Sequence, residues 1–167
     1  MRLAIVSLLA LCLTLTACSG SERDDIGDDD LEQIEEGLEH GFVLADETAS
    51  LARHNAHRAQ HVGAPALEMR QCLKRVARAW AKHIAETNEF EHNPNLAHQI
   101  SNECPWSWKL AGENIGHGST EESLFDAWLA SKLHHENLDR ARYRRVGIGA
   151  YRNGDGLWMV VNFADPL

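Results

Sequence analysis

The C-terminal part of the chain contains two β-rich runs separated by a short glycine-containing segment, and this arrangement constrains the fold most. The runs are RRVGIGAY (144–151) and LWMVVNF (157–163), and RNGDG (152–156) lies between them. Asn-Gly and Asp-Gly pairs between β-rich runs are typical of a hairpin. We therefore expect an antiparallel pair of strands at the end of the chain.

The segments before this hairpin are mostly helical in pattern. ETASLARHNAHRAQHVG (47–63) predicts a helix that ends at glycine, and ALEMRQCLKRVARAWAKHIAETN (66–88) carries an apolar stripe at three-to-four spacing. A capping box at 119–122 predicts a third helix, whose apolar residues are Leu124, Phe125, Trp128, Leu129 and Leu133. Helices followed by a terminal hairpin indicate an α+β fold rather than a doubly wound sheet.

The region from Glu89 to Gly118 is rich in Asn, Pro and Gly, and we expect it to be mostly loop. It ends in AGENIGHG (111–118), which has three glycines around Glu113, Asn114 and His117. Because glycine is unfavourable in helices and strands, this octapeptide predicts a bend that carries a carboxylate.

The N-terminus resembles a bacterial lipoprotein signal. A basic start is followed by an uncharged run, LAIVSLLALCLTLTA (3–17), which is short for a membrane span, and then by Cys18. The segment Leu15-Thr16-Ala17-Cys18 resembles the lipoprotein cleavage box, in which the Cys is lipidated; an ordinary signal peptide is the alternative. We expect an exported protein anchored to the membrane of a bacterial cell envelope, the outer membrane in a Gram-negative host.

The charge distribution divides the remainder into a linker and a domain. Residues 19–47 contain 12 acidic residues and one arginine, whereas residues 48–167 contain 13 acidic and 14 basic residues. We therefore predict a signal peptide over 1–17, the lipidated Cys and an acidic linker over 18–45, and a folded domain over 46–167. This domain lacks the basic face that a nucleic-acid partner requires.

Two cysteines remain in the predicted domain, Cys72 and Cys104. In an exported protein two cysteines are more often paired than free, so we expect a disulfide. The alternative is that Cys72 is a small buried residue of the helical stripe.

Ten histidines make this side chain unusually frequent. We expect His54, His57, His61 and His83 to be solvated or capping residues on helices. His92 follows a predicted helix end, and His134 follows Ser131 by three residues. Together with Glu113 these two histidines could bind a divalent metal, for which zinc is suited, or form a proton-transfer group. Only a fold could bring three such distant residues together.

Several segments, in their order along the chain, resemble the CAP superfamily of cysteine-rich secretory, antigen 5 and pathogenesis-related 1 proteins (the SCP domain), and its bacterial form most. The resemblance covers about residues 50–163. Its motifs are Asn55-x-x-Arg58 with Gly63, Phe90-x-His92, Gly112-Glu113-Asn114-Ile115, Trp128-x-x-Ser131-x-x-His134-x-x-Asn137-Leu138, Val146-Gly147-Ile148-Gly149, and Trp158 to Phe163.

The resemblance implies an α-β-α sandwich with a central antiparallel sheet and a cleft containing two histidines and two acidic residues. By motif, His92 and His134 match the histidines, and Glu113 matches the first acid. The position of the second acid holds Ser131, as in many bacterial members, and the candidate substitutes for this acid are Glu121, Glu122 and Asp126. His117 and His135 are additional imidazoles beside the matching positions, and we expect them to be exposed; the alternative is that they join the site.

Three functions remain open from the sequence. The favoured one is a binding module, not an enzyme, whose cleft holds a divalent metal, with zinc as the possible cofactor, or a small lipid, sterol or envelope glycan. A zinc-dependent hydrolase of peptide or cell-wall substrates is the second, but Glu113 could not be both metal ligand and general base. The third is an envelope scaffold in which Glu113 braces both histidines.

Overall fold

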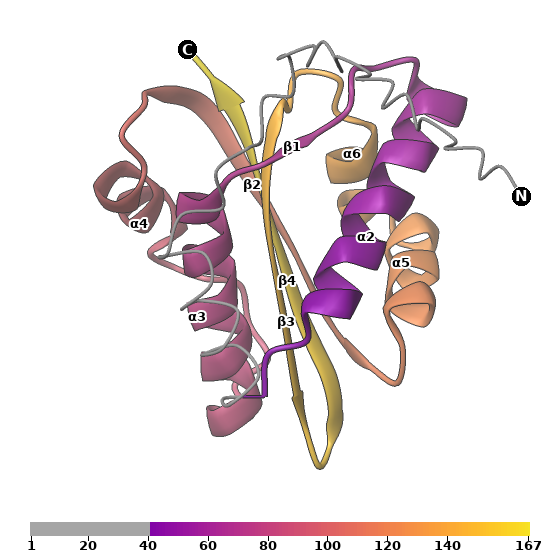
Figure 1. Ribbon diagram of the computed structural model, residues 1–167, viewed down its shortest axis with the longest axis vertical. Coiled ribbons are helices and arrows are strands. Elements are labelled where there is room, and N and C mark those ends of the chain that lie inside the picture. Colours follow the sequence, from indigo (N-terminus) through magenta and orange to yellow (C-terminus); the bar gives the residue numbers. More distant parts are fainter. Residues whose placement is uncertain (1–40) are drawn as a thin grey trace, which may run out of the picture.

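The computed structural model describes residues 41–167, and these form three layers (Figure 1). Helices α2 (Leu44–His57), α5 (Glu121–Ala130) and α6 (Lys132–Asp139) cover one face of the sheet, and α3 (Gln71–Thr87) and α4 (Leu96–Glu103) cover the other. The predicted α-β-α sandwich is therefore confirmed. The predicted signal peptide, Cys18 and most of the linker lie outside the described residues. Within residues 41–167 no helix is both long and apolar enough to span a bilayer.

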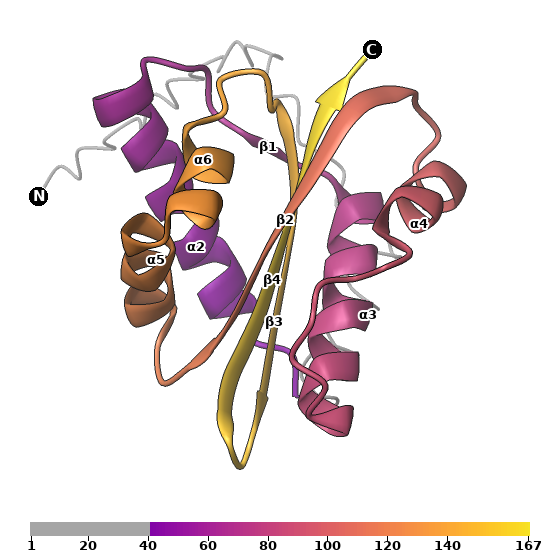
Figure 2. The same ribbon diagram turned by 180° about the vertical axis from the view of Figure 1, so that it is seen from behind.

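The sheet contains four strands in the order β1-β3-β4-β2. Strands β3 (Arg145–Asn153) and β4 (Gly156–Pro166) form the predicted hairpin, and β2 (Trp108–Gly118) pairs antiparallel with β4. The short strand β1 (Glu68–Met69) pairs parallel with β3, so the sheet is mixed rather than wholly antiparallel. This order leaves β2 at one edge, where it separates the two helical layers (Figure 2).

Helix α3 lies directly on the sheet because its apolar stripe meets two glycines of β3. Leu73, Ala77, Ala81 and Ile84 are fully buried along this stripe. A Cβ atom at Gly147 would collide with the backbone of Leu73, so the absence of side chains allows this close approach. The disulfide predicted between Cys72 and Cys104 is present, and it joins the start of α3 to the residue that follows α4.

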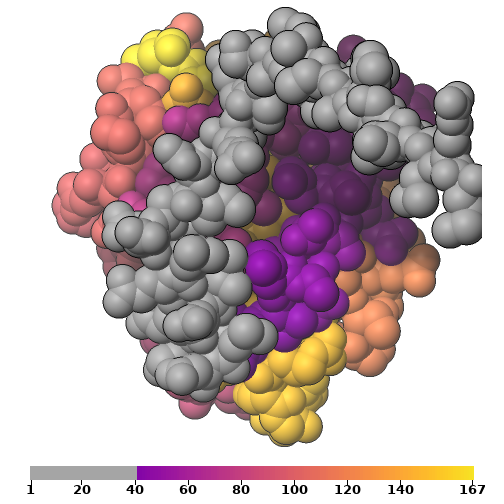
Figure 3. All heavy atoms as spheres, viewed as in Figure 1, coloured from indigo at the N-terminus to yellow at the C-terminus, as the bar shows by residue number. Residues whose placement is uncertain are grey.

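Helix α2 continues into one π-helical turn, η1 (Arg58–Val62), and ends at Gly63 in the left-handed conformation. Its outer side lies at the surface beside α5 and the β3–β4 hairpin (Figure 3). His54 faces inward, is 1% exposed and packs against Phe125, Trp128 and Phe163. The prediction that His54 is solvated was wrong because the helix turns this residue toward the core.

The prediction of a loop over Glu89–Gly118 was wrong in two places. Residues 96–103 form α4, and AGENIGHG belongs to strand β2, in continuous register with β4 from Leu157 to Ala164. The glycines do not bend this strand. A Cβ at Gly112 would collide with the hydroxyl of Tyr143, and a Cβ at Gly116 would make a tight contact with the side chain of Trp128.

The third predicted helix is interrupted at Ser131, which has extended backbone angles of φ −97° and ψ 116°. Helix α5 ends before this residue and α6 begins after it. Leu133 therefore leaves the apolar stripe and is 74% exposed, contrary to our prediction. The interruption redirects the chain so that α6 lies beside β2.

Candidate functional site

Glu113 and His92 form a direct contact at the edge strand β2. Nδ1 of His92 lies 2.8 Å from Oε1 of Glu113, and the backbone N–H of Asn93 donates to the same oxygen at 2.9 Å. The Glu113 side chain is 4% exposed, whereas that of His92 is 59% exposed. The other oxygen of Glu113, Oε2, is buried without a hydrogen-bond partner in the protein. A buried carboxylate thus orients an accessible imidazole.

The loop that carries His92 is held at several points. Asn88 ends α3 in the left-handed conformation, with φ 58°. The ring of Phe90 then meets the edge of Trp158, and Nε1 of Trp80 donates to the carbonyl of Glu91. These contacts bring the chain back across the sheet edge to β2, so His92 reaches Glu113 from the α3 side.

His134 reaches the same edge from the opposite helical layer. Its ring centroid lies 6.2 Å from that of His92, and its Nδ1 lies 2.9 Å from Oγ of Ser131. Successive residues of a strand point to opposite faces, so Glu113 faces α3 and Asn114 faces α6. The two histidines therefore meet around β2, and we call His92, Glu113 and His134 the edge cluster.

Two asparagines fix α6 against β2. Nδ2 of Asn114 donates to the carbonyl of His134 at 3.1 Å, and Nδ2 of Asn137 donates to the Asn114 side chain at 2.9 Å and to the Glu113 carbonyl at 3.2 Å. Asn114 is fully buried. The sequence did not predict this positioning role, although both asparagines belong to the family motifs.

Burial dominates the electrostatics of the edge cluster. Desolvation raises the pKa of Glu113 above its ordinary value, against opposing hydrogen bonds from Asn93 and His92. Desolvation also lowers the pKa of His134, and the nearby His92 adds to this effect. Both shifts favour the uncharged forms, and a neutral imidazole is the form that binds a metal.

The donor set of the edge cluster suits zinc, which accepts imidazole nitrogen and carboxylate oxygen. However, Oε1 of Glu113 already accepts from His92 and Asn93. The arrangement therefore fits a site in which His92 and His134 are ligands through their remaining nitrogens. Glu113 then orients His92, as outer-shell carboxylates orient metal-binding histidines.

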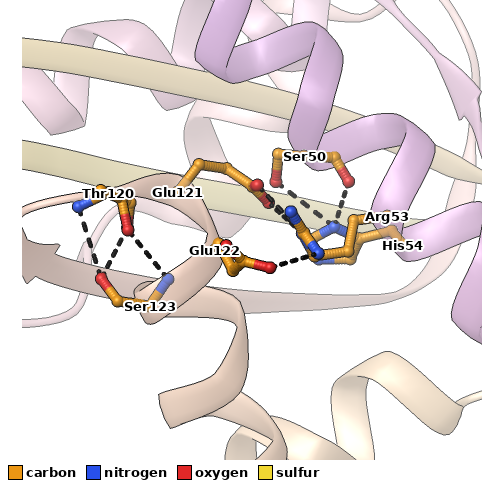
Figure 4. Close-up of polar contacts among 7 residues, drawn as sticks. All are labelled: Ser50, Arg53, His54, Thr120, Glu121, Glu122 and Ser123. Atoms are coloured by element: carbon orange, nitrogen blue, oxygen red, sulfur yellow. Dashed lines mark hydrogen bonds and ion pairs between the residues drawn. The ribbon is translucent and has the colours of Figure 1, made fainter.

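The structure offers no second acid at the edge cluster among the residues considered as replacements for Ser131. Arg53 donates to both oxygens of Glu121 and lies 3.5 Å from Glu122, so both carboxylates pair with α2 instead (Figure 4). Asp126 is exposed on α5. Ser131 contacts His134 directly, so this serine occupies the position with a hydroxyl in place of a carboxylate.

The additional histidines lie elsewhere. His117 stacks on Trp158 at a centroid distance of 3.7 Å, at the hairpin end of β2, and His83 stacks on Trp80. His135 lies on the α2 side of α6, where its ring centroid is 5.7 Å from that of His57. The structure thus separates the neighbours His134 and His135 into two different groups.

Comparison with known proteins identifies relatives by sequence. Residues 51–163 match the family model described as CAP, the cysteine-rich secretory protein family. The uncharacterized protein YkwD of Bacillus subtilis (strain 168) is 31% identical over 108 residues, which are 62% of this chain and 41% of YkwD. The chain therefore spans less than half the length of this relative.

Solved structures show the same fold at lower identity. An outer surface protein from Borrelia burgdorferi has a TM-score of 0.67 at 21% identity, over 75% of this chain and 98% of its own. An extracellular SCP-domain protein from Bacillus anthracis str. Ames has a TM-score of 0.62 at 24% identity, over 87% of this chain and 45% of its own.

Proposed function

The chain belongs to the CAP family of cysteine-rich secretory proteins, and we propose that it is an exported, membrane-anchored binding module whose edge cluster holds a divalent metal ion. In this proposal His92 and His134 are the protein ligands, and Glu113 orients His92. When bound, the metal supplies open coordination positions for a group of an envelope ligand.

One observation carries this proposal. A carboxylate that is 4% exposed holds an imidazole that is 59% exposed, and a second imidazole from the other helical layer lies beside it. Burying a carboxylate is costly unless its partners compensate, and Oε2 of Glu113 has no protein partner. A buried carboxylate with such an unfavourable free energy of desolvation is typical of a functional site.

The surroundings also suit a small apolar or amphipathic ligand such as a lipid, a sterol or a glycan. Of the residues in the described part, four large hydrophobic side chains are exposed: Leu44, Phe90, Leu133 and Leu167. Phe90 is two residues from His92, and Leu133 is adjacent to His134. Because these two exposed apolar side chains are close in sequence to His92 and His134, they support an apolar or amphipathic ligand in this proposal.

Export and anchoring are supported by the N-terminal sequence and by the descriptions of the relatives. The uncharged run at 3–17 followed by Cys18 is typical of a lipoprotein signal. The relatives with the same fold include an outer surface protein and an extracellular protein. Acyl labelling of the expressed protein tests this proposal: Cys18→Ala should abolish incorporation of label, and a variant that remains labelled would exclude Cys18 as the anchor.

A zinc-dependent hydrolase is the second candidate, because a buried carboxyl, whose pKa burial raises, lies beside two histidines, and a carboxyl can act as a general base. Two observations favour binding over hydrolysis. Oε1 of Glu113 already accepts two hydrogen bonds, and none of Glu121, Glu122 and Asp126 supplies a second acid.

Zinc binding to the full chain in detergent tests the metal proposal. Equilibrium dialysis should show that His92→Gln and His134→Gln each weaken zinc binding, whereas His98→Gln, an exposed histidine of α4, should not. Identical binding by the parent and both edge variants would overturn the proposal.

Turnover of peptide or peptidoglycan by the parent but not by Glu113→Gln would favour the hydrolase. If lipid extraction and mass spectrometry of the purified protein detect no lipid, a copurified lipid ligand is excluded.

A further inference from the structure

A second group of metal-binding side chains lies between α2 and α6, on the other side of α6 from the edge cluster. Within residues 41–167 it is the one group of three His, Cys, Asp or Glu residues whose ligand atoms all lie within 4.8 Å of one another. Its members are His57 on α2 and His135 and Asp139 on α6. We call them the interhelical cluster.

Asp139 connects the two histidines through its two oxygens. Its Oδ1 lies 2.7 Å from Nε2 of His57, and its Oδ2 lies 3.4 Å from Nε2 of His135. His135 and Asp139 are four residues apart on α6 and therefore share one helix face. His57 approaches this face from α2, beside which α6 lies (Figure 2). Two Nε2 atoms and one carboxylate thus converge on a single point.

The cluster borders open space. His135 and Asp139 line a surface cavity of about 480 Å³ together with Lys132, Glu136 and Arg140. The side chains of His135 and Asp139, which are 40% and 48% exposed, are accessible to an ion that enters from this cavity. The His57 side chain is only 10% exposed and completes the cluster from the α2 side. The cavity carries both acidic and basic side chains, so its net field does not strongly attract cations. Binding would depend on the ligand atoms themselves.

The chemistry of these ligand atoms selects a class of ion. Imidazole nitrogen suits Zn²⁺, Ni²⁺ and Cu²⁺, whereas Ca²⁺ and Mg²⁺ prefer oxygen ligands only. Two histidines and one carboxylate, with water in the fourth position, match the tetrahedral preference of zinc. The distances between neighbouring ligand atoms, 2.7 and 3.4 Å, require little movement of the side chains.

We propose that His57, His135 and Asp139 form a second zinc-type metal site, which joins α2 to α6 and is independent of the edge cluster. A bound ion replaces the two histidine–aspartate contacts by coordination bonds. Because its ligands come from two helices far apart in the sequence, the ion should stabilise the packing of these helices against each other.

Zinc binding to the full chain tests this site separately from the edge cluster. Equilibrium dialysis and thermal unfolding compare three proteins. These are the parent, the double variant His92→Gln/His134→Gln, and a quadruple variant that adds His57→Gln/Asp139→Asn. The edge double variant should retain one zinc per chain, and zinc should raise its Tm. The quadruple variant should bind zinc at least tenfold more weakly and show no zinc-dependent change in Tm.

Two results would overturn the proposal: an edge double variant that binds no zinc at micromolar free metal, or a quadruple variant that binds zinc as tightly as the edge double variant. Circular dichroism establishes that each variant folds, and if the quadruple variant does not fold, Asp139→Asn in the edge-double background replaces it with the same expectation. The converse variant, His57→Gln/Asp139→Asn alone, retains zinc only if the edge cluster binds it. Failure of the proposed function is thus distinguishable from failure of this inference.

Discussion

Nδ1 of His92 lies 2.8 Å from Oε1 of Glu113, and this contact joins the most exposed member of the edge cluster to its most buried member. The carboxylate gains two hydrogen bonds from this arrangement but remains poorly solvated, and its pKa is therefore raised. The contact therefore orients the imidazole of His92, although burial of the carboxylate does not stabilise the fold.

Glu113→Gln should therefore separate stability from metal binding. A raised pKa in the folded state means that the stability contributed by this carboxyl is present at low pH and is lost as the pH rises from 4.5 through the folded-state pKa. At pH 7 the Gln variant should unfold at an equal or higher Tm than the parent. Its zinc affinity should fall about 10- to 100-fold because His92 loses the carboxyl oxygen that orients its ring. A lower Tm with unchanged zinc affinity would contradict this role.

His54 should make the protein sensitive to acid. Burial lowers the pKa of His54 from 6.5 to about 4, so between these values the unfolded chain binds a proton that the folded protein does not. Stability should fall as the pH decreases through this window, by on the order of 3 kcal/mol. Urea unfolding at several pH values should show a shallower pH dependence for His54→Leu than for the parent. His61→Gln, an exposed histidine of η1, is the control and should retain the parental dependence.

Arg78→Met should destabilise the fold because it leaves a buried charge. Glu47 of α2 is 1% exposed, and both of its oxygens accept from Arg78 of α3, at 2.7 and 2.8 Å. Lys74 retains part of the pairing, so we expect a loss of about 3 kcal/mol in the free energy of unfolding. Lys82→Met on the same helix breaks only an exposed pair with Glu86 and should leave the stability nearly unchanged. Equal effects of the two substitutions in urea unfolding would refute this explanation.

Gly147→Ala should disrupt the contact between α3 and β3. The added Cβ would collide with backbone atoms of Leu73 and Lys74, which cannot move away as a flexible side chain would. We expect a loss of about 3 kcal/mol or more, at the upper end of overpacking effects. Gly154→Ala in the hairpin turn, where no atom lies within 4 Å of the new Cβ, is the control and should be nearly neutral. A Gly147→Ala protein with parental Tm would show that α3 can shift at no cost.

Local sequence patterns predicted the elements whose structure depends on nearby residues. The stripe of α3 and the turn between β3 and β4 are such cases, since periodicity and turn residues act over a few positions. The same reasoning failed for AGENIGHG, because β4 supplies the hydrogen bonds that keep this segment extended. It failed for His54 because the position of α5 determines which face of α2 is buried.

The sequence by itself determined helix α3, the terminal hairpin of β3 and β4, the pairing of two cysteines, and the residue types of the candidate site. Family motifs in the sequence also identified His92, Glu113 and His134 as one group. The tertiary structure alone decided that Glu113 is buried against His92, that His134 approaches from the opposite layer, and that His135 joins His57 and Asp139 instead. These relations depend on the packing of α6 and of the His92 loop around an edge strand, and contacts between segments so distant in the chain leave no local pattern in the sequence.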